Sequence, residues 1–183
     1  KDSVAIDNLL KASNKQLSSK YKLQKYLQEN SNYKFYVSYK DYPAIARREE
    51  YNKDSLYNYY QNQWQQIYAF TPITTTIDEM KSTGKIGIII NKNLRQSIIE
   101  TYNNYDYFVS YYQENYITTQ AETLKMVLDD VPELFLSTNE TLLKFFQNKR
   151  VRNRFDSNFV LTINRGLIEL QNVNQKLLNA LNE

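Results

Sequence analysis

Residues 91–128 read NKNLRQSIIETYNNYDYFVSYYQENYITTQAETLKMVL and contain neither glycine nor proline. Apolar and aromatic side chains recur three or four positions apart from Leu94 to Tyr116, which is the spacing of one face of an α-helix. At 1.5 Å per residue, a helix of roughly 35 residues would be about 50 Å long. The stretch therefore predicts one long amphipathic helix, opened by Asn91, that would be the longest in the chain.

Both ends of the chain also carry amphipathic patterns. No glycine or proline interrupts residues 2–29, and residues 160–181 have a heptad-like seam in which Asn174 is the one polar member. A buried asparagine in such a seam fixes helix register, so we expect Asn174 to face a helix of this chain or of a second copy. The apolar positions are Ile6, Leu9, Leu10, Leu17, Leu23 and Leu27 in the first helix, and Val160, Ile163, Leu167, Leu170, Leu177 and Leu181 in the last.

Capping signals predict shorter helices between these long ones. Asp54 has the place of an N-cap, and the pairs Thr76 with Glu79 and Ser137 with Glu140 have the spacing of capping boxes. We therefore expect one helix to begin near residue 54, a second near residue 77 and a third near residue 138.

Two segments resist a simple helical interpretation. The run 86–90 follows Gly84, which should end the preceding helix, and it is apolar and β-branched. Because no second run of that kind is present to pair with it, we expect a buried connection instead of a strand. For residues 33–42, which are rich in tyrosine, we expect a short helix or an irregular crossover.

The composition supports a helical fold. Only 3 glycines and 3 prolines occur in 183 residues, too few for the many turns of a β-sandwich or barrel. The length suits one hydrophobic core, and long amphipathic helices must bury their apolar stripes against one another. We therefore predict an all-α fold, an antiparallel bundle of three or four long helices with short connecting helices, that forms a single domain over residues 1–183.

The residue types restrict the chemistry. The chain has 17 tyrosines but no histidine and no cysteine, so it lacks disulfides and the side chains that most often act in acid–base catalysis, as nucleophiles or as zinc ligands. We expect a non-enzymatic protein without cofactor or metal. The 23 basic and 20 acidic residues are close to balance, which does not favour a nucleic-acid partner.

The stretch 71–102, TPITTTIDEMKSTGKIGIIINKNLRQSIIETY, resembles a family of small membrane-anchored Bacteroidota proteins of unknown function. The resemblance lies in the order of a Thr-Pro pair, a short helix, a Ser-x-Gly turn, an isoleucine-rich run and an Asn-x-x-Leu helix start. It implies a basic leader and one transmembrane helix before Lys1, although residues 1–183 contain no run of about 18 apolar residues. The positive-inside rule would then place the domain on the periplasmic side of the inner membrane. The matching residues are Thr71, Pro72, Met80, Ser82, Gly84, Ile88, Ile89, Ile90, Asn91 and Leu94.

Two groups of residues are candidates for binding. Aromatic side chains with a few polar partners are typical of ligand pockets, although core packing would also explain them. A dense basic stretch could contact an anionic surface such as lipid headgroups or nucleic acid, although a basic helix end interacting with its own dipole needs no ligand. The first group is Trp64, Tyr68, Asn91, Arg95, Tyr102 and Tyr105, and the second is Lys149, Arg150, Arg152 and Arg154.

These observations predict a non-enzymatic, extracytoplasmic helical domain of a membrane-anchored bacterial protein. It would bind another protein or a copy of itself, or sense a ligand, and an anchor outside this sequence would attach it to the inner membrane. The alternative is a cytosolic helical adaptor that binds nucleic acid or protein through the basic stretch around Arg150.

Overall fold

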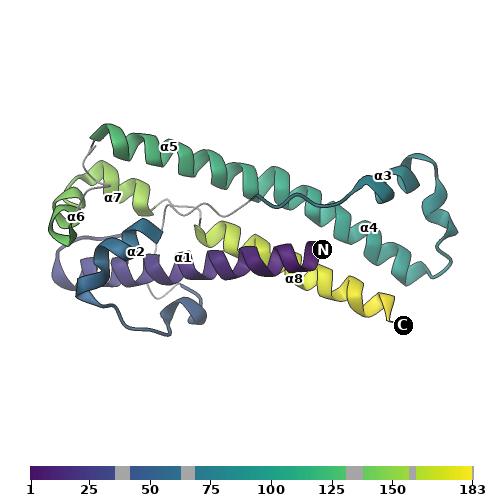
Figure 1. Cartoon of the computed structure of the whole chain (residues 1–183), viewed down its shortest axis with the longest axis horizontal. Helices are drawn as coiled ribbons and strands as arrows, with labels where there is room; N and C mark the ends of the chain where they lie inside the picture. The colour runs from purple at the N-terminus through teal and green to yellow at the C-terminus, as the bar shows by residue number, and fades with distance from the viewer. Residues whose placement is uncertain (36–41, 63–68, 131–137, 157–159, 183) are drawn as a thin grey trace. The chain divides into compact units, whose positions relative to one another are not determined.

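A computed structural model describes residues 1–35, 42–62, 69–130, 138–156 and 160–182. All the regular structure in these residues is helical, which confirms the all-α prediction, and short helices connect the long ones (Figure 1). No described helix is both long enough and apolar enough to span a bilayer. The elements are α1 Asp2–Asn30, the 3-10 helices η2 Ala44–Arg47 and η3 Lys53–Ser55, α2 Leu56–Asn62, α3 Thr75–Ser82, the 3-10 helix η4 Lys85–Ile88, α4 Lys92–Tyr107, the π-helix η5 Phe108–Gln113, α5 Glu114–Asp130, α6 Asn139–Phe145, α7 Lys149–Asp156 and α8 Val160–Leu181.

The chain divides into two compact units, each built from separate stretches of sequence. Unit 1 comprises Lys1–Leu10, Tyr68–Asn115 and Thr162–Glu183, and unit 2 comprises Lys11–Ile67 and Tyr116–Leu161. The single domain over residues 1–183 stays a prediction.

In unit 1, α8 runs antiparallel to the helix formed by α4 and η5. The Tyr105 hydroxyl donates a hydrogen bond of 2.9 Å to Oδ1 of Asn174. Gly166, which precedes Asn174 in α8, lies against Tyr112 and Phe108, which follow Tyr105. Asn174 therefore sets register within the chain, the first of its two predicted roles. The seam is buried from Val160 to Asn174, but Leu181 is 56% exposed, so its last position was predicted wrongly.

A side chain replaces backbone pairing in unit 1 where the chain passes Phe70. The Gln113 carboxamide accepts a hydrogen bond from Phe70 N (2.6 Å) and donates one to Phe70 O (3.2 Å). The Phe70 ring packs edge-on against the rings of Tyr105 and Phe108. Gln113 thus anchors a segment without regular structure against the π-helix.

In unit 2, the core is formed mainly by aromatic and leucine side chains. The Tyr60 ring contacts Phe145 and Phe146 edge-on, and Phe146 contacts Phe155 in the same way. The buried cluster consists of Leu23, Leu27, Leu56, Tyr60, Met126, Leu142, Phe145, Phe146, Val151 and Phe155.

A fully buried lysine was not expected in this core. The Lys20 ammonium donates a hydrogen bond of 2.7 Å to the Phe155 carbonyl and lies over the Phe155 ring. Burial lowers the pKa of Lys20, and the nearby Asp156 carboxylate offsets only part of this effect, so that the pKa is about 7. The ion is therefore held by a carbonyl, an aromatic face and a buried acid.

The long helix of residues 91–128 is confirmed and extends to Asp130, but the π-helix η5 interrupts its α-helical hydrogen bonds. Asn91 caps it as predicted, accepting a hydrogen bond from Leu94 N at 3.1 Å. Gly84 ends α3 with a left-handed φ of 71°, also as predicted. The apolar spacing of the long helix, the Asn91 cap and the glycine at position 84 could therefore each be predicted from the local sequence.

The other cap predictions were wrong. Asn52, not Asp54, caps η3 by accepting from Asp54 N. α3 begins at Thr75, so Thr76 lies inside the helix and cannot form a capping box with Glu79.

The cap of α6 also differs from the prediction. Thr138 accepts from Thr141 N and takes the place expected of a box between Ser137 and Glu140. Ser137 itself lies outside the described residues, as does most of the predicted crossover at residues 33–42.

The predicted buried connection at residues 86–90 was also wrong. Ile88 is 70% exposed and Ile90 is 92% exposed, and the segment forms the short 3-10 helix η4 between α3 and α4. Its apolar character suggested full burial, but only Ile86 and Ile89 are partly buried.

Candidate functional site

The predicted aromatic ligand site is only partly covered by the described residues. Trp64 and Tyr68 lie outside them. Tyr102 is half-buried and packs edge-on against Tyr105 at 5.4 Å between ring centroids. Tyr105 is buried, and burial together with the charge of Asp2 raises the pKa of its hydroxyl.

The two polar members of that group stabilise a turn. Asn91 is the exposed N-cap of α4, and Arg95 Nη1 donates to the Ile89 carbonyl at 3.3 Å. The structure thus gives four of the six residues a packing or capping contact, and a ligand pocket at this group stays a prediction.

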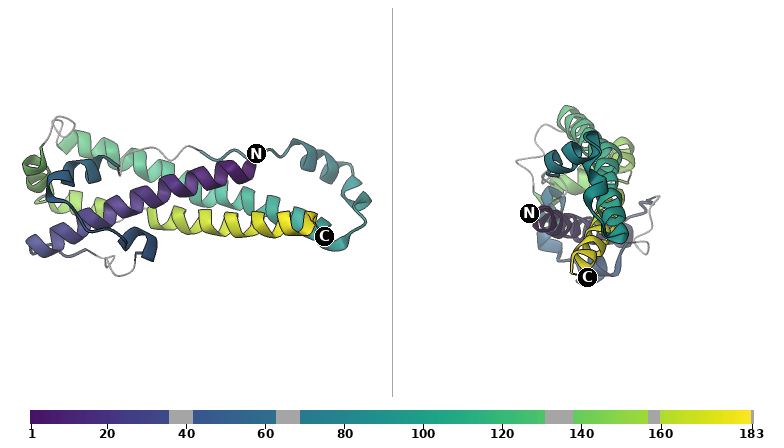
Figure 2. Two further views of the ribbon diagram at one scale, coloured as in Figure 1. Left: turned by 60° about the horizontal axis from the view of Figure 1, so that its bottom comes forward. Right: turned by 90° about the vertical axis from the view of Figure 1, so that its right-hand side faces the viewer.

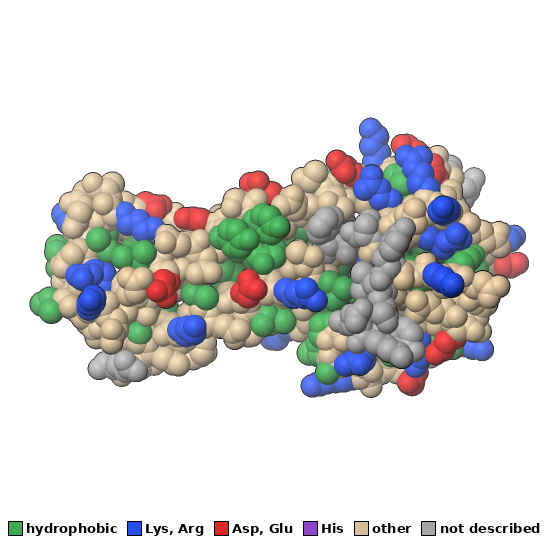
Figure 3. All heavy atoms as spheres, turned by 180° about the vertical axis from the view of Figure 1, so that it is seen from behind, with side chains coloured by type: hydrophobic (Ala, Val, Ile, Leu, Met, Phe, Trp, Pro, Cys, Tyr) green, Lys and Arg blue, Asp and Glu red, His purple; other side chains and the backbone are tan. Residues whose placement is uncertain are grey.

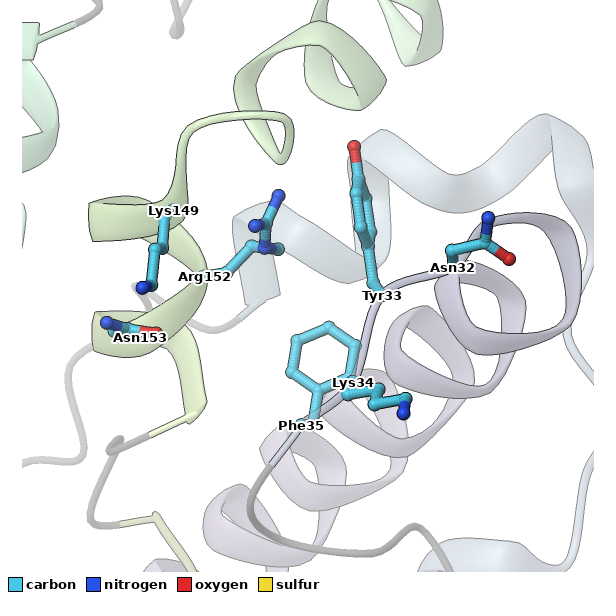
Figure 4. Close-up of a pocket in the computed structure, with 7 residues that line it drawn as sticks. All are labelled: Asn32, Tyr33, Lys34, Phe35, Lys149, Arg152 and Asn153. Carbon is cyan, nitrogen blue, oxygen red and sulfur yellow. The ribbon is translucent and has the colours of Figure 1, made fainter.

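The basic stretch is α7, and its members lie in different surroundings. Arg150 is 3.7 Å from the Asp130 carboxylate, and Arg154 lies in the last turn of the helix. Lys149 and Arg152, however, line a pocket of about 370 Å³ together with the residues that follow α1 (Figure 4). The pocket brings two of the four predicted basic residues together.

The pocket, hereafter the α7 pocket, has cationic, amide and aromatic walls. α7 contributes Lys149, Arg152 and Asn153, and the stretch 32–35 contributes the facing wall. Figure 4 shows Arg152 between Lys149 and Tyr33, and shows the Lys34 ammonium directed away from α7. Among the residues that the structure describes, no carboxylate lines the pocket. Its described lining is Asn32, Tyr33, Lys34, Phe35, Lys149, Arg152 and Asn153.

Arg152 holds the floor of the α7 pocket in place. Its Nη1 donates to the carbonyls of Phe146 and Gln147, each at 2.9 Å, where α6 has ended. The guanidinium carbon lies 4.5 Å from the centroid of the Tyr33 ring, a cation–π contact. The hydrogen bonds of Arg152 to described residues all use Nη1, which makes Nε and Nη2 its candidate donors to a ligand.

Lys149 contributes charge without a fixed partner. It is exposed at the start of α7, and no ion pair involves it among the described residues. Asn148 accepts from Arg150 N at 2.9 Å and thereby caps the same helix. The positive end of the α7 dipole therefore adds to the charge of Lys149 at the pocket.

The wall of residues 32–35 was missed in the sequence. Its signal, two aromatic residues around a lysine after the end of a long helix, is short and common. The Phe35 ring packs against Phe155 at 5.8 Å between centroids, which places this wall beside α7. That pairing joins residues more than a hundred positions apart and could not be predicted from local spacing.

In the part of the chain that the structure describes, no group of three or more acidic side chains is arranged to hold a metal ion. Comparison with protein-family models, curated proteins and solved structures finds no match for this chain.

Proposed function

We propose that this chain is a non-enzymatic helical binding domain that senses a small anionic ligand in the α7 pocket. The observation that carries the proposal is the convergence of Lys149, Arg152 and Asn153 on a pocket to which the described residues contribute no acidic side chain. The seven described lining residues offer no charge that neutralises these cations, so an anionic group would supply it.

The donors suit a phosphate or carboxylate group. A guanidinium presents planar N–H groups that match such anions, and Nε and Nη2 of Arg152 are available as a pair. The volume lies near the lower end of the range usual for small-molecule sites. Tyr33 and Phe35 would contact an apolar or planar part of the ligand.

The residue types support binding without turnover. The sequence has no histidine or cysteine, and the described lining of the α7 pocket includes no carboxylate that could act as a general base. The side chains that line it can donate hydrogen bonds to a ligand and stack against it, which is enough to bind the ligand without transforming it.

The cellular setting is the second part of the proposal. The domain would face the periplasm, held by an inner-membrane anchor outside this sequence, and would transmit ligand binding to another protein or to a second copy. The resemblance of residues 71–102 to membrane-anchored proteins supports this setting. Protease digestion of spheroplasts carrying the full-length protein tests it, because a periplasmic domain is degraded while the cytoplasm stays intact.

The alternative, an adaptor that binds nucleic acid through α7, has less support. Arg152 bonds the carbonyls of Phe146 and Gln147, which follow α6, and Arg150 is close to Asp130. α7 therefore does not present an unbroken basic row. Binding to DNA with a steep dependence on salt would favour this alternative.

An NMR titration with inorganic phosphate and with succinate tests the ligand proposal. We expect saturable amide shifts confined to residues 32–35 and 148–153, and Lys149→Gln should weaken binding about three- to tenfold because one charge-assisted contact is lost. Lys125→Gln, which removes an exposed lysine of α5, is the matched control. Shifts spread over all surface lysines, or equal weakening by both variants, would contradict the proposal.

A further inference from the structure

The turn between α3 and α4 exposes isoleucines that a folded domain would ordinarily bury. Ile88 is 70% and Ile90 is 92% exposed. A Cβ atom added at Gly87 would meet no atom within 4 Å. We call residues 85–92 the apolar tip.

Specific contacts fix the backbone on both sides of the apolar tip. Before it, the left-handed Gly84 ends α3, and Thr83 N bonds Glu79 O at 3.1 Å. After it, Asn91 caps α4 and Arg95 Nη1 donates to Ile89 O at 3.3 Å. Ile88 and Ile90 are therefore presented outward by an ordered turn, whereas Ile86 and Ile89 are partly buried.

Basic residues surround the apolar tip, and acidic residues are absent from it. Between residues 80 and 99 the sequence has four cations, Lys81, Lys85, Lys92 and Arg95, and no aspartate or glutamate. In Figure 3, where this end of unit 1 lies at the left, green hydrophobic side chains stand beside blue basic ones. An apolar turn flanked in sequence by lysines complements an anionic lipid interface.

The end of α8 adds to the same region of unit 1. Figures 1 and 2 show the C-terminus beside the turn that joins α3 to α4. Leu178 is 38% exposed and Leu181 is 56% exposed. These leucines add exposed apolar surface at the end of α8.

From these observations we propose that the apolar tip inserts into the headgroup region of an anionic bilayer. Ile88 and Ile90 would enter the boundary with the acyl chains, while Lys85 and Lys92 keep their ammonium groups at the phosphates. Protein-binding surfaces are typically enriched in tyrosine, tryptophan and arginine and depleted in lysine, unlike this isoleucine and lysine surface. Insertion would stop at the interface, because the turn's polar backbone groups need water or headgroups.

This inference is independent of the α7 pocket, which lies in unit 2. Cosedimentation of the purified chain with phosphatidylcholine vesicles, with and without phosphatidylglycerol, measures it. We expect binding that requires phosphatidylglycerol and that weakens by at least about tenfold when Ile88 and Ile90 are both replaced by serine. Ile45→Ser, which removes a 43% exposed isoleucine of η2, is the matched control and should bind like the unchanged chain.

A fluorescent label locates the inserted segment. The chain has no cysteine, so Ile90→Cys provides a unique position for an environment-sensitive nitrobenzoxadiazole dye. Its emission should shift to the blue on binding to anionic vesicles, and the same dye at Ile45→Cys should not shift. Circular dichroism of each variant tests whether it keeps the helical fold.

Three results would overturn the inference. They are no binding to anionic vesicles, binding that survives the double isoleucine replacement, and binding lost through Lys149→Glu in α7 while the isoleucine variant still binds. Phosphate binding at the α7 pocket should be unchanged in the isoleucine variant, so failure of one proposal is distinguishable from failure of the other.

Discussion

Replacing Gly166 with alanine tests the closest helix contact in unit 1. An added Cβ would lie 2.8 Å from both Cγ and Cδ2 of Tyr112 and 3.1 Å from Cδ2 of Phe108. The first two contacts are shorter than carbon atoms tolerate. Tyr112 Cγ is bonded directly to Cβ, so the ring cannot avoid the added atom by a small rotation. The substitution should therefore force α8 and the π-helix apart.

Two opposing effects set the magnitude. Alanine is favoured over glycine inside a helix by up to about 1 kcal/mol, whereas overpacking a tight contact typically costs about 1–3 kcal/mol. Because the clash involves ring atoms, we expect the upper part of that range, and hence a net loss of about 1–2 kcal/mol in the free energy of unfolding. Urea denaturation followed by circular dichroism measures this loss.

The other two glycines of the chain are internal controls. Gly87→Ala meets no atom within 4 Å and should change stability by less than about 0.5 kcal/mol. Gly84→Ala has space but must adopt a φ of 71°, which costs roughly 1 kcal/mol for a residue with a Cβ. In a Tyr112→Ala background, the cost of Gly166→Ala should fall close to zero. Equal stability of the Gly166 and Gly87 variants would refute the close approach.

Further predictions concern buried polar groups and one cap. Lys20 is protonated in both states below pH 7, and above that pH the unfolded chain binds the extra proton because the folded pKa is about 7. The free energy of unfolding should accordingly rise by up to about 1.4 kcal/mol per unit between pH 7 and 9, and Lys20→Met should remove this rise in urea denaturation at several pH values. Tyr105→Phe should cost about 1–3 kcal/mol because it leaves Asn174 Oδ1 buried without its donor; adding Asn174→Leu should recover part of that loss, and strictly additive effects would argue against the pair. Asn91→Ala should cost about 1 kcal/mol through loss of the cap on Leu94 N, and thermal unfolding that is unchanged would contradict that cap.

The helices could be predicted because their signal is local. Three-to-four spacing of apolar residues located α1, the helix from α4 to α5, and α8, and it identified Asn174 as a register residue. The same spacing could not reveal the π-helix η5, because one wider turn leaves no distinctive mark in sequence composition.

Burial was predicted less well where a residue's type and its surroundings disagree. The buried Lys20 ammonium bonds the Phe155 carbonyl and lies near the charge of Asp156. Both partners lie more than 130 positions away in the sequence. Ile90 is exposed although it is apolar, because it precedes the Asn91 cap in a turn that points it to solvent. In both cases the deciding contacts belong to the tertiary structure.

In the candidate site, too, local signals could be predicted and tertiary contacts could not. Lys149 and Arg152 were identified by charge density alone. Tyr33 and Phe35 were not, since only the packing of the segment after α1 against α7 gives them a place in the α7 pocket.

The Gln113 carboxamide has a consequence for sequence variation. It offers Phe70 the same donor and acceptor that a peptide group in a neighbouring strand would offer, so it imitates a single residue of β-structure inside a helical protein. Glutamate has nearly the same volume but, when ionised, only acceptors, and its charge would oppose the Phe70 carbonyl. Natural variants should therefore keep glutamine at this position even where the surrounding tyrosines are replaced. Deamidation of Gln113 would remove the hydrogen bond to the Phe70 carbonyl while leaving the volume of the side chain nearly unchanged.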